Sequence, residues 1–133
     1  MSRPFVSALV AGTVMMVTLP SIAVANKDGD PKEGEDVFRA RCRQCHQVGP
    51  DAKNALGPLL NGVLGRKAGT IDGFSYSPAN KKAGEEGWTW IDDNLLKYLE
   101  NPREAMPGNR MAFVGLKDEQ ERRDLVAYLK TFK

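Results

Sequence analysis

Cys42-Arg43-Gln44-Cys45-His46 is the stretch around which the chain is organised, because it sets two thiols three residues apart and a histidine directly after the second. Residues i and i+3 lie on the same face of a helical turn, so both thiols can reach one edge of a planar ligand. The pattern Cys-x-x-Cys-His is typical of haem c attachment. The sequence therefore predicts one covalently bound haem c per chain, with thioether bonds to Cys42 and Cys45 and with His46 on the iron.

Three alternatives to haem attachment compete for the pentapeptide. A redox-active disulfide between Cys42 and Cys45 is one, but such motifs usually open the helix of a βαβ unit, and no such pattern is found in this sequence. A structural zinc site needs four ligands, whereas the chain offers two cysteines and one histidine. A chance occurrence is the third. The specificity of the five-residue pattern favours haem attachment over all of them.

The first 25 residues have the pattern of a secretory signal peptide. Arg3 supplies the positive charge, residues 5–19 form an uncharged apolar run, and residues 23–25 (Ala-Val-Ala) have the form that signal peptidase cleaves. The run is shorter than the roughly 20 apolar residues that span a bilayer, which favours a cleaved signal over a retained anchor. We therefore expect residues 1–25 to be removed on export to the periplasm and residues 26–133 to form one haem domain.

The charge of the chain is nearly balanced. Lys and Arg number 19 against 17 Asp and Glu, which gives a formal net charge of +2 at pH 7. This balance excludes a protein that holds nucleic acid through bulk positive charge, although it leaves room for a local basic patch.

The pattern of apolar residues after the signal segment predicts an all-α fold of about three main helices, short helices and long loops. The first helix has Asp30 as its cap and Pro31 at its first position. Gly34 shares a face with Phe38, and a glycine inside a helix indicates the close approach of another helix. The first helix is expected to begin at Pro31 and to deliver the chain to His46. Three more helices are expected at 77–82, 89–101 and 118–132, and Thr89 is the expected cap of the second of these.

The remaining segments are expected to be irregular. Glycines and prolines interrupt any periodicity in residues 47–75 and again in residues 103–116. Loops of such length count against a compact domain unless a ligand fills the space that they enclose. A haem would fill that space.

The residues leave the second axial ligand of the iron open. His46 is the single histidine of the chain, so ligation by two histidines within one chain is excluded. Met106 and Met111 both follow the signal segment, and either thioether could bind iron, as could a lysine at higher pH. Met111 follows a Pro-Gly turn that can present it inward, whereas Met106 precedes the turn, where a packing role is the simpler interpretation.

From about Gly34 to Lys130 the sequence resembles the soluble class I cytochromes c, both mitochondrial and bacterial periplasmic of the cytochrome c2 type. The motifs that carry the resemblance are the pentapeptide, Gly57-Pro58, Gly65-Arg66-Lys67, Gly73-Phe74-Ser75-Tyr76, Trp90, and segments 98–102 (Tyr-Leu-Glu-Asn-Pro), 107–111 (Pro-Gly-Asn-Arg-Met) and 124–129 (Asp-Leu-Val-Ala-Tyr-Leu). The resemblance implies the class I cytochrome c fold and an electron carrier rather than an enzyme. It also implies that Gly34 lies where the first and last helices cross.

The resemblance further implies roles for single residues. Met111 becomes the axial sulfur opposite His46, and the carbonyl of Pro58 accepts a hydrogen bond from the other ring nitrogen of that histidine. Tyr98 directs its hydroxyl at the sulfur, and Asn80 orders nearby water. Three further side chains are implied to hold the haem propionates: Arg66, Tyr76 and Trp90.

Ligation by histidine and methionine fills both axial positions, so it implies electron transfer rather than oxygen or substrate chemistry. Two further functional classes stay open at this point. One is a haem peroxidase-like or gas-binding module in which Met111 dissociates, and the other is a thiol oxidoreductase without haem.

The partners are implied only as a class. A monomeric carrier of this kind meets acidic redox partners through a basic rim around the exposed haem edge. The residues that match this rim are Arg41, Lys53, Arg103, Arg110 and Lys117. A cytochrome bc1-type complex, a terminal oxidase, a photosynthetic reaction centre or a periplasmic dehydrogenase would each suit the chain, whereas no nucleic-acid partner is expected.

Overall fold

The computed structural model describes residues 27–133, so the predicted signal peptide at 1–25 lies outside the described residues. In the described part the chain is helical, and its only extended pairing is an isolated antiparallel bridge between Lys67 and Thr89. The helices in chain order are α1 (Pro31–Arg41), α2 (Pro78–Glu85), α3 (Asp92–Glu100), α4 (Pro102–Ala105) and α5 (Glu119–Leu129). The predicted all-α class is confirmed.

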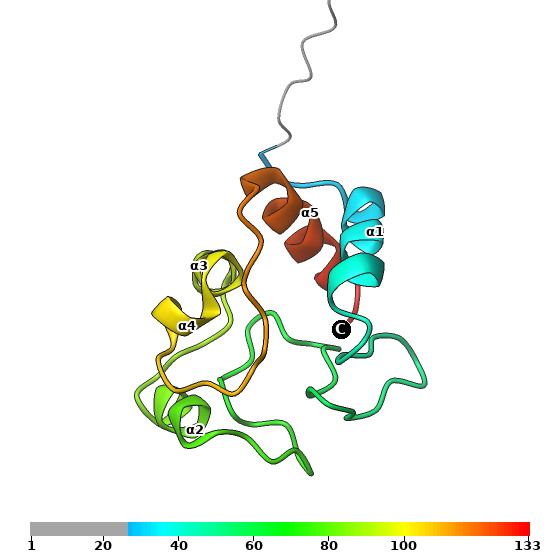
Figure 1. The fold of residues 1–133 in the computed structure, drawn as a ribbon. Coiled ribbons are helices and arrows are strands. Elements are labelled where there is room, and N and C mark those ends of the chain that lie inside the picture. Colours follow the sequence, from blue (N-terminus) through cyan, green and yellow to red (C-terminus); the bar gives the residue numbers. More distant parts are fainter. Residues whose placement is uncertain (1–26) are drawn as a thin grey trace, which may run out of the picture.

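Helices α1 and α5 lie side by side although they stand at opposite ends of the domain sequence (Figure 1). A Cβ atom on Gly34 would lie 1.9 Å from the carbonyl oxygen of Asp124 and 2.8 Å from the Cβ atom of Tyr128. One turn further along, the rings of Phe38 and Tyr128 pack with their centroids 5.6 Å apart. The helical glycine therefore marks the helix crossing, as the sequence predicted.

The start of α1 is fixed by two carboxylates. Asp30 caps the helix by accepting a hydrogen bond from the backbone N–H of Lys32 at 2.8 Å, with Pro31 at the first helical position. The backbone N–H of Asp30 in turn donates to the buried Asp124 of α5 at 2.7 Å. The cap thus joins the first helix to the last.

Three predicted boundaries were wrong. Helix α2 continues to Glu85, beyond the expected end at Lys82, and α5 ends at Leu129 rather than near residue 132. Thr89 is not the cap of α3, which begins at Asp92 without a side-chain cap. The reason is tertiary pairing of the segment around Thr89: Trp90 N–H donates to the carbonyl of Arg66 at 2.8 Å, which holds this backbone extended.

Helix α4 lies in a stretch that was predicted to be irregular. Pro102 ends α3, as expected, but the same proline opens a new turn of helix. Asn101 caps that turn, since its side chain accepts from the N–H of Glu104. The short helix positions the loop that carries Met111.

The core lies between α3, α5 and the long loops. Leu125 is completely buried, and Trp90 packs its ring edge-on against Tyr98, with the centroids 4.9 Å apart. Met106 is also a core residue, at 4% exposure, which confirms its predicted packing role. Among residues 27–133, no helix has the length and apolar character needed to cross a bilayer.

Candidate haem-binding site

The pentapeptide continues the chain directly from α1. Cys42 is the C-cap of the helix and donates its N–H to the carbonyl of Phe38 at 2.8 Å. The N–H groups of Cys45 and His46 then donate to the carbonyl of Cys42 at 3.0 and 2.9 Å, which closes one further turn. This turn brings the two thiols and the imidazole together on a short piece of backbone.

The thiols are not joined to each other. Cys42 and Cys45 are both free cysteines, the first half-buried and the second exposed. Burial, together with the neighbouring Cys45, raises the pKa of the Cys42 thiol to about 11. Reactive Cys-x-x-Cys thiols have a lowered pKa instead, so this observation weighs against a thiol oxidoreductase.

His46 is held by the loop that follows it. Its Nδ1 lies 2.7 Å from the carbonyl oxygen of Pro58. Because a carbonyl can only accept, Nδ1 carries the proton and Nε2 keeps a free lone pair. Burial lowers the pKa of His46, which favours the neutral ring that a metal requires.

Gly57 completes the cradle of the imidazole. A Cβ atom at this position would lie 2.4 Å from Cε1 of His46 and under 3 Å from both ring nitrogens. The N–H of Gly57 also donates to the carbonyl of Cys45 at 2.8 Å, which ties the loop to the pentapeptide. A side chain at residue 57 is therefore excluded by the ring, and the donor set of two thiols and one imidazole nitrogen fits a haem c.

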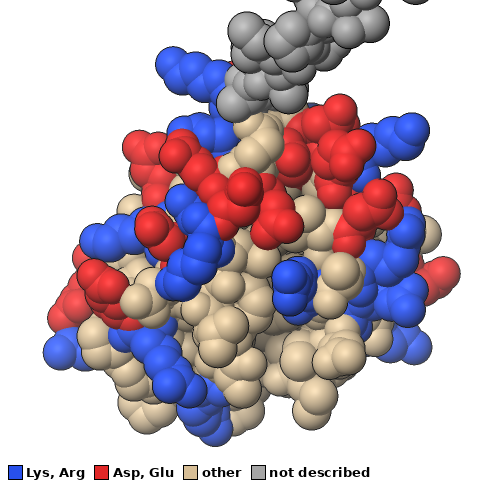
Figure 2. Space-filling model, turned by 45° about the horizontal axis from the view of Figure 1, so that its top comes forward, with Lys and Arg blue, Asp and Glu red and all other residues tan. Residues whose placement is uncertain are grey.

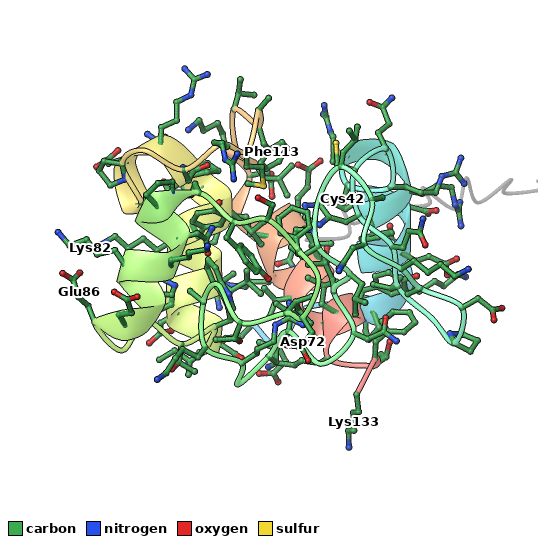
Figure 3. The ribbon with its side chains drawn as sticks, turned by 90° about the horizontal axis from the view of Figure 1, so that it is seen from below. Cys42, Asp72, Lys82, Glu86, Phe113 and Lys133 are labelled. Atoms are coloured by element: carbon green, nitrogen blue, oxygen red, sulfur yellow. The ribbon has the colours of Figure 1, made fainter. Side chains whose placement is uncertain are left out.

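Met111 and Met106 lie in different environments. Met111 is half-buried at the edge of the core, whereas Met106 is enclosed in it. Figure 3 shows Phe113, two residues beyond Met111, on the same side of the molecule as Cys42. The environments favour Met111 over Met106 as a ligand, and its ligation stays a prediction.

The residues predicted to hold the propionates are brought into one region. Arg66 donates to the carbonyls of Asn61 at 3.0 Å and Leu59 at 3.3 Å, and burial lowers its pKa. The hydroxyl of Tyr76 accepts from the N–H of Ile71 at 3.3 Å, while burial raises the pKa of this phenol. Arg66 and Tyr76 also influence each other electrostatically, so they lie close together.

Two buried polar atoms have no hydrogen-bond partner among the described residues near this region. They are Oδ1 of Asn80 and Nε1 of Trp88. Buried polar atoms are normally paired, so the unpartnered Oδ1 of Asn80 fits a site that a bound group or water completes, whereas Trp88 lines the cavity described below. Asn80 was predicted to order water, whereas Trp88 was missed, although it stands two residues before Trp90, whose ring it contacts with a centroid distance of 5.8 Å.

A cavity of about 560 Å³ lies elsewhere, between α2 and residues 105–107. Its lining includes Trp88 and Met106, with Lys82 and Glu86 at α2. Figure 3 shows these two α2 residues on the opposite side of the view from Cys42. Neither His46 nor Met111 lines the cavity, so the assignment of the site rests on the cradle around His46 instead.

The predicted docking residues are all exposed. The side chains of two of them bind backbone carbonyls: Arg110 donates to the carbonyl of Ser75 at 2.8 Å, and Lys117 donates to the carbonyl of Glu100 at 2.7 Å. The other three are Arg41, Lys53 and Arg103. Figure 2 shows basic and acidic side chains interspersed on one face, so the basic rim stays a prediction.

Comparison with known proteins decides the family. The chain is 48% identical to the solved structure of cytochrome c2 from Rhodospirillum Centenum, with a TM-score of 0.73 over 79% of this chain and 99% of that one. The chain belongs to the cytochrome c family. The chain is also 52% identical over 102 residues to cytochrome c of Gibberella zeae, covering 77% of this chain and 93% of that protein. The cytochrome c2 of Rhodomicrobium vannielii is 51% identical over 109 residues, covering 82% and 84%.

A family model also matches most of the described residues. The model described as cytochrome c oxidase, cbb3-type, subunit III matches residues 29–129. Members of the cytochrome c family bind haem c and carry electrons, so the predicted fold, cofactor class and electron-carrier role are confirmed at this level.

Proposed function

We propose that this cytochrome is a periplasmic single-haem carrier of one electron. Its haem c is attached through thioether bonds to Cys42 and Cys45, and its iron is held between His46 and Met111. The observation that carries the proposal is the cradle of His46, in which Nδ1 donates to Pro58 at 2.7 Å and Gly57 leaves room for the ring. This arrangement leaves Nε2 as the imidazole nitrogen whose lone pair can bind a metal.

The residues around His46 act as its support. The carbonyl of Pro58 fixes the tautomer of the ring and makes the imidazole a stronger donor. When bound, haem c supplies an iron that gains and loses one electron. Met111 offers a weak thioether donor, which favours the reduced state and raises the potential relative to two histidines. With His46 and Met111 both on the iron, no position would remain for oxygen or substrate, which favours a carrier over a peroxidase-like or gas-binding module.

The predicted signal peptide and the family support the proposed location and partners of the protein. The signal pattern at 1–25 supports export to the periplasm, the compartment in which a bacterial carrier meets its membrane complexes. The partners would be a cytochrome bc1-type complex, a terminal oxidase, a photosynthetic reaction centre or a periplasmic dehydrogenase. Sequencing the N-terminus of the exported protein tests the location: a start at Asn26 supports cleavage, and a start at Met1 contradicts it.

The iron ligand is tested by a matched pair of methionine variants. We expect Met111→Leu to abolish the weak far-red absorption band that ferric iron shows when sulfur is its ligand. Met106→Leu replaces a buried methionine with a side chain of similar volume, so this variant should keep the band. The ligand assignment is wrong if Met111→Leu retains it unchanged.

The attachment is tested by mass analysis of the purified protein. We expect a peptide that contains residues 42–46 to carry the mass of one haem after denaturation and removal of non-covalent groups. A chain mass without any bound porphyrin would contradict the proposal as a whole.

A further inference from the structure

The loop that carries Met111 is anchored firmly at its far end. The N–H of Leu116 donates to the carbonyl of Leu99 at 2.8 Å, and the buried Arg122 donates to the carbonyl of Leu116 at 2.7 Å. A Cβ atom on Gly115 would lie 2.1 Å from the carbonyl oxygen of Glu100, so the loop runs tightly against the end of α3. This anchor lies several residues beyond Met111 and does not reach it directly.

At the near end of the loop, Arg110 donates to the carbonyl of Ser75 at 2.8 Å, but most of the side-chain hydrogen bonds come from Asn109. The amide nitrogen of Asn109 donates to the carbonyls of Pro102 and Met106, both at 2.8 Å. Its Oδ1 accepts from the backbone N–H of Met111 at 2.9 Å. The orientation of the amide is fixed by chemistry, because the two carbonyls need a donor and the N–H needs an acceptor.

We infer that Asn109 is the positioning residue of the axial sulfur, since its half-buried amide joins the backbone of Met111 to α4 through Pro102 and to the turn at Met106. The inference rests on the proposed ligation by Met111. Asn109 does not itself touch the iron; it holds the segment from which the sulfur projects.

The physical effect is preorganisation. A thioether is a weak ligand, so it competes with other donors only while its backbone is held in place. The other backbone bond recorded at Met111, from the N–H of Phe113 to its carbonyl at 3.0 Å, lies within the loop and gives no attachment to the rest of the fold. Without the Asn109 amide, the segment that carries Met111 would be held less firmly, so the sulfur would give way more readily to an added ligand.

Imidazole titration of the ferric holoprotein measures this release. Imidazole binds the iron only after the sulfur has left, so its apparent dissociation constant reports how firmly the loop holds Met111. Asn109→Ala removes three hydrogen bonds, and we expect imidazole to bind it at least about tenfold more tightly than the wild type. Asn109→Asp keeps an acceptor for Met111 but loses both donations, and it should also bind imidazole more tightly.

Asn94→Ala is the matched control. Asn94 is another half-buried asparagine whose amide donates to a backbone carbonyl, that of Thr89 at 2.8 Å, but it lies in α3 away from the loop. Unfolding by denaturant measures how much stability each variant loses, and only Asn109→Ala should change imidazole affinity.

Each outcome decides the inference. Unchanged imidazole affinity in Asn109→Ala, or an equal change in Asn94→Ala, overturns it while leaving the ligand assignment intact. Absence of the far-red band from the wild-type protein overturns both. Should Asn109→Ala not be recovered with haem, a threefold or smaller change in Asn109→Asp overturns the inference.

Discussion

The carbonyl oxygen of Pro58 lies 2.7 Å from Nδ1 of His46, and the residue directly before it is a glycine whose Cα faces the same ring. Two neighbouring residues thus fix two properties of the imidazole. Pro58 fixes which nitrogen carries the proton, and Gly57 fixes where the ring can lie. Gly57 and Pro58 therefore orient His46 of the pentapeptide, although the two segments are separated along the chain.

Gly57→Ala is therefore expected to prevent assembly of the haem site. The added Cβ would lie 2.4 Å from the His46 ring, which must move away from Pro58 to relieve the overlap. The yield of haem-loaded protein per polypeptide, measured from the Soret absorbance, should fall at least about fivefold, because overpacking of this kind costs about 1–3 kcal/mol.

Gly49→Ala provides a control for Gly57→Ala. A Cβ at Gly49 meets nothing within 4 Å, although its φ of +107° adds some backbone strain. This variant should be modestly less stable yet load haem normally. Equal haem yields from the two variants would contradict the role assigned to Gly57.

Gly34→Ala is expected to destabilise the fold, which reverses the usual effect of this change. In an open helix, alanine is favoured over glycine by about 1 kcal/mol. Here the Cβ would lie 1.9 Å from the carbonyl of Asp124 in α5, so the helices must separate. We expect the free energy of unfolding in denaturant to fall by about 1–3 kcal/mol. Lys32→Ala, at an exposed position of the same helix, should change it by less than about 0.5 kcal/mol.

The protein is expected to lose stability in strong alkali because Tyr98 is buried. Burial raises its pKa to about 12, from an ordinary value of 10.0. Between these two values the unfolded chain releases a proton that the folded chain keeps, so unfolding becomes more favourable as the pH rises. The contribution is complete below pH 10 and is lost progressively above it, by about 2 kcal/mol at pH 12.

Denaturant unfolding at a series of pH values from 7 to 12 measures this loss. Tyr98→Phe removes the ionisable group and should flatten the decline above pH 10. Tyr128→Phe removes a less buried phenol and should leave most of the decline in place. A decline of the same size in Tyr98→Phe and the wild type would show that other groups cause it.

Local signals in the sequence predicted a large part of this fold. Asp30 before Pro31 is a side-chain cap that acts within a few residues, and it caps as expected. Asp118, the expected start of the last helix, is the cap of α5. Gly34 was informative because a glycine in a helix is costly unless another helix needs the space. The relation between His46 and Pro58 was implied by the family resemblance, and the distance of 2.7 Å in the structure agrees with it.

The missed features depend on contacts between distant segments. Thr89 carries the local signal of a helix cap, but its backbone pairs with Lys67, which no pattern around residue 89 reveals. The cap of α4 by Asn101 is a local signal, but the same Asn-Pro pair also ends α3, and an end alone does not predict a new helix. The role of Asn109 depends on where Pro102 and Met106 place their carbonyls, so it required the structure.

Arg103 and Arg110 are predicted to lie in the face that meets redox partners. Both are exposed, and Arg103 lies in α4, directly before the loop of Met111. Arg103→Glu should slow reduction of the ferric protein by a purified cytochrome bc1-type complex by about threefold to tenfold at low salt, and should weaken the dependence of that rate on ionic strength. Arg110→Glu should act alike, provided that its far-red band is unchanged, because Arg110 also donates to Ser75.

Lys32→Glu is the matched control for these charge reversals. It changes the net charge by the same amount at an exposed position of α1, which lies across the molecule from α4 (Figure 1). A general effect of net charge would slow the reduction of Lys32→Glu as much as that of Arg103→Glu. A local docking face would slow the reduction of Arg103→Glu only. If Arg103→Glu kept both the wild-type rate and the wild-type salt dependence, the docking face would have to be sought elsewhere on the surface.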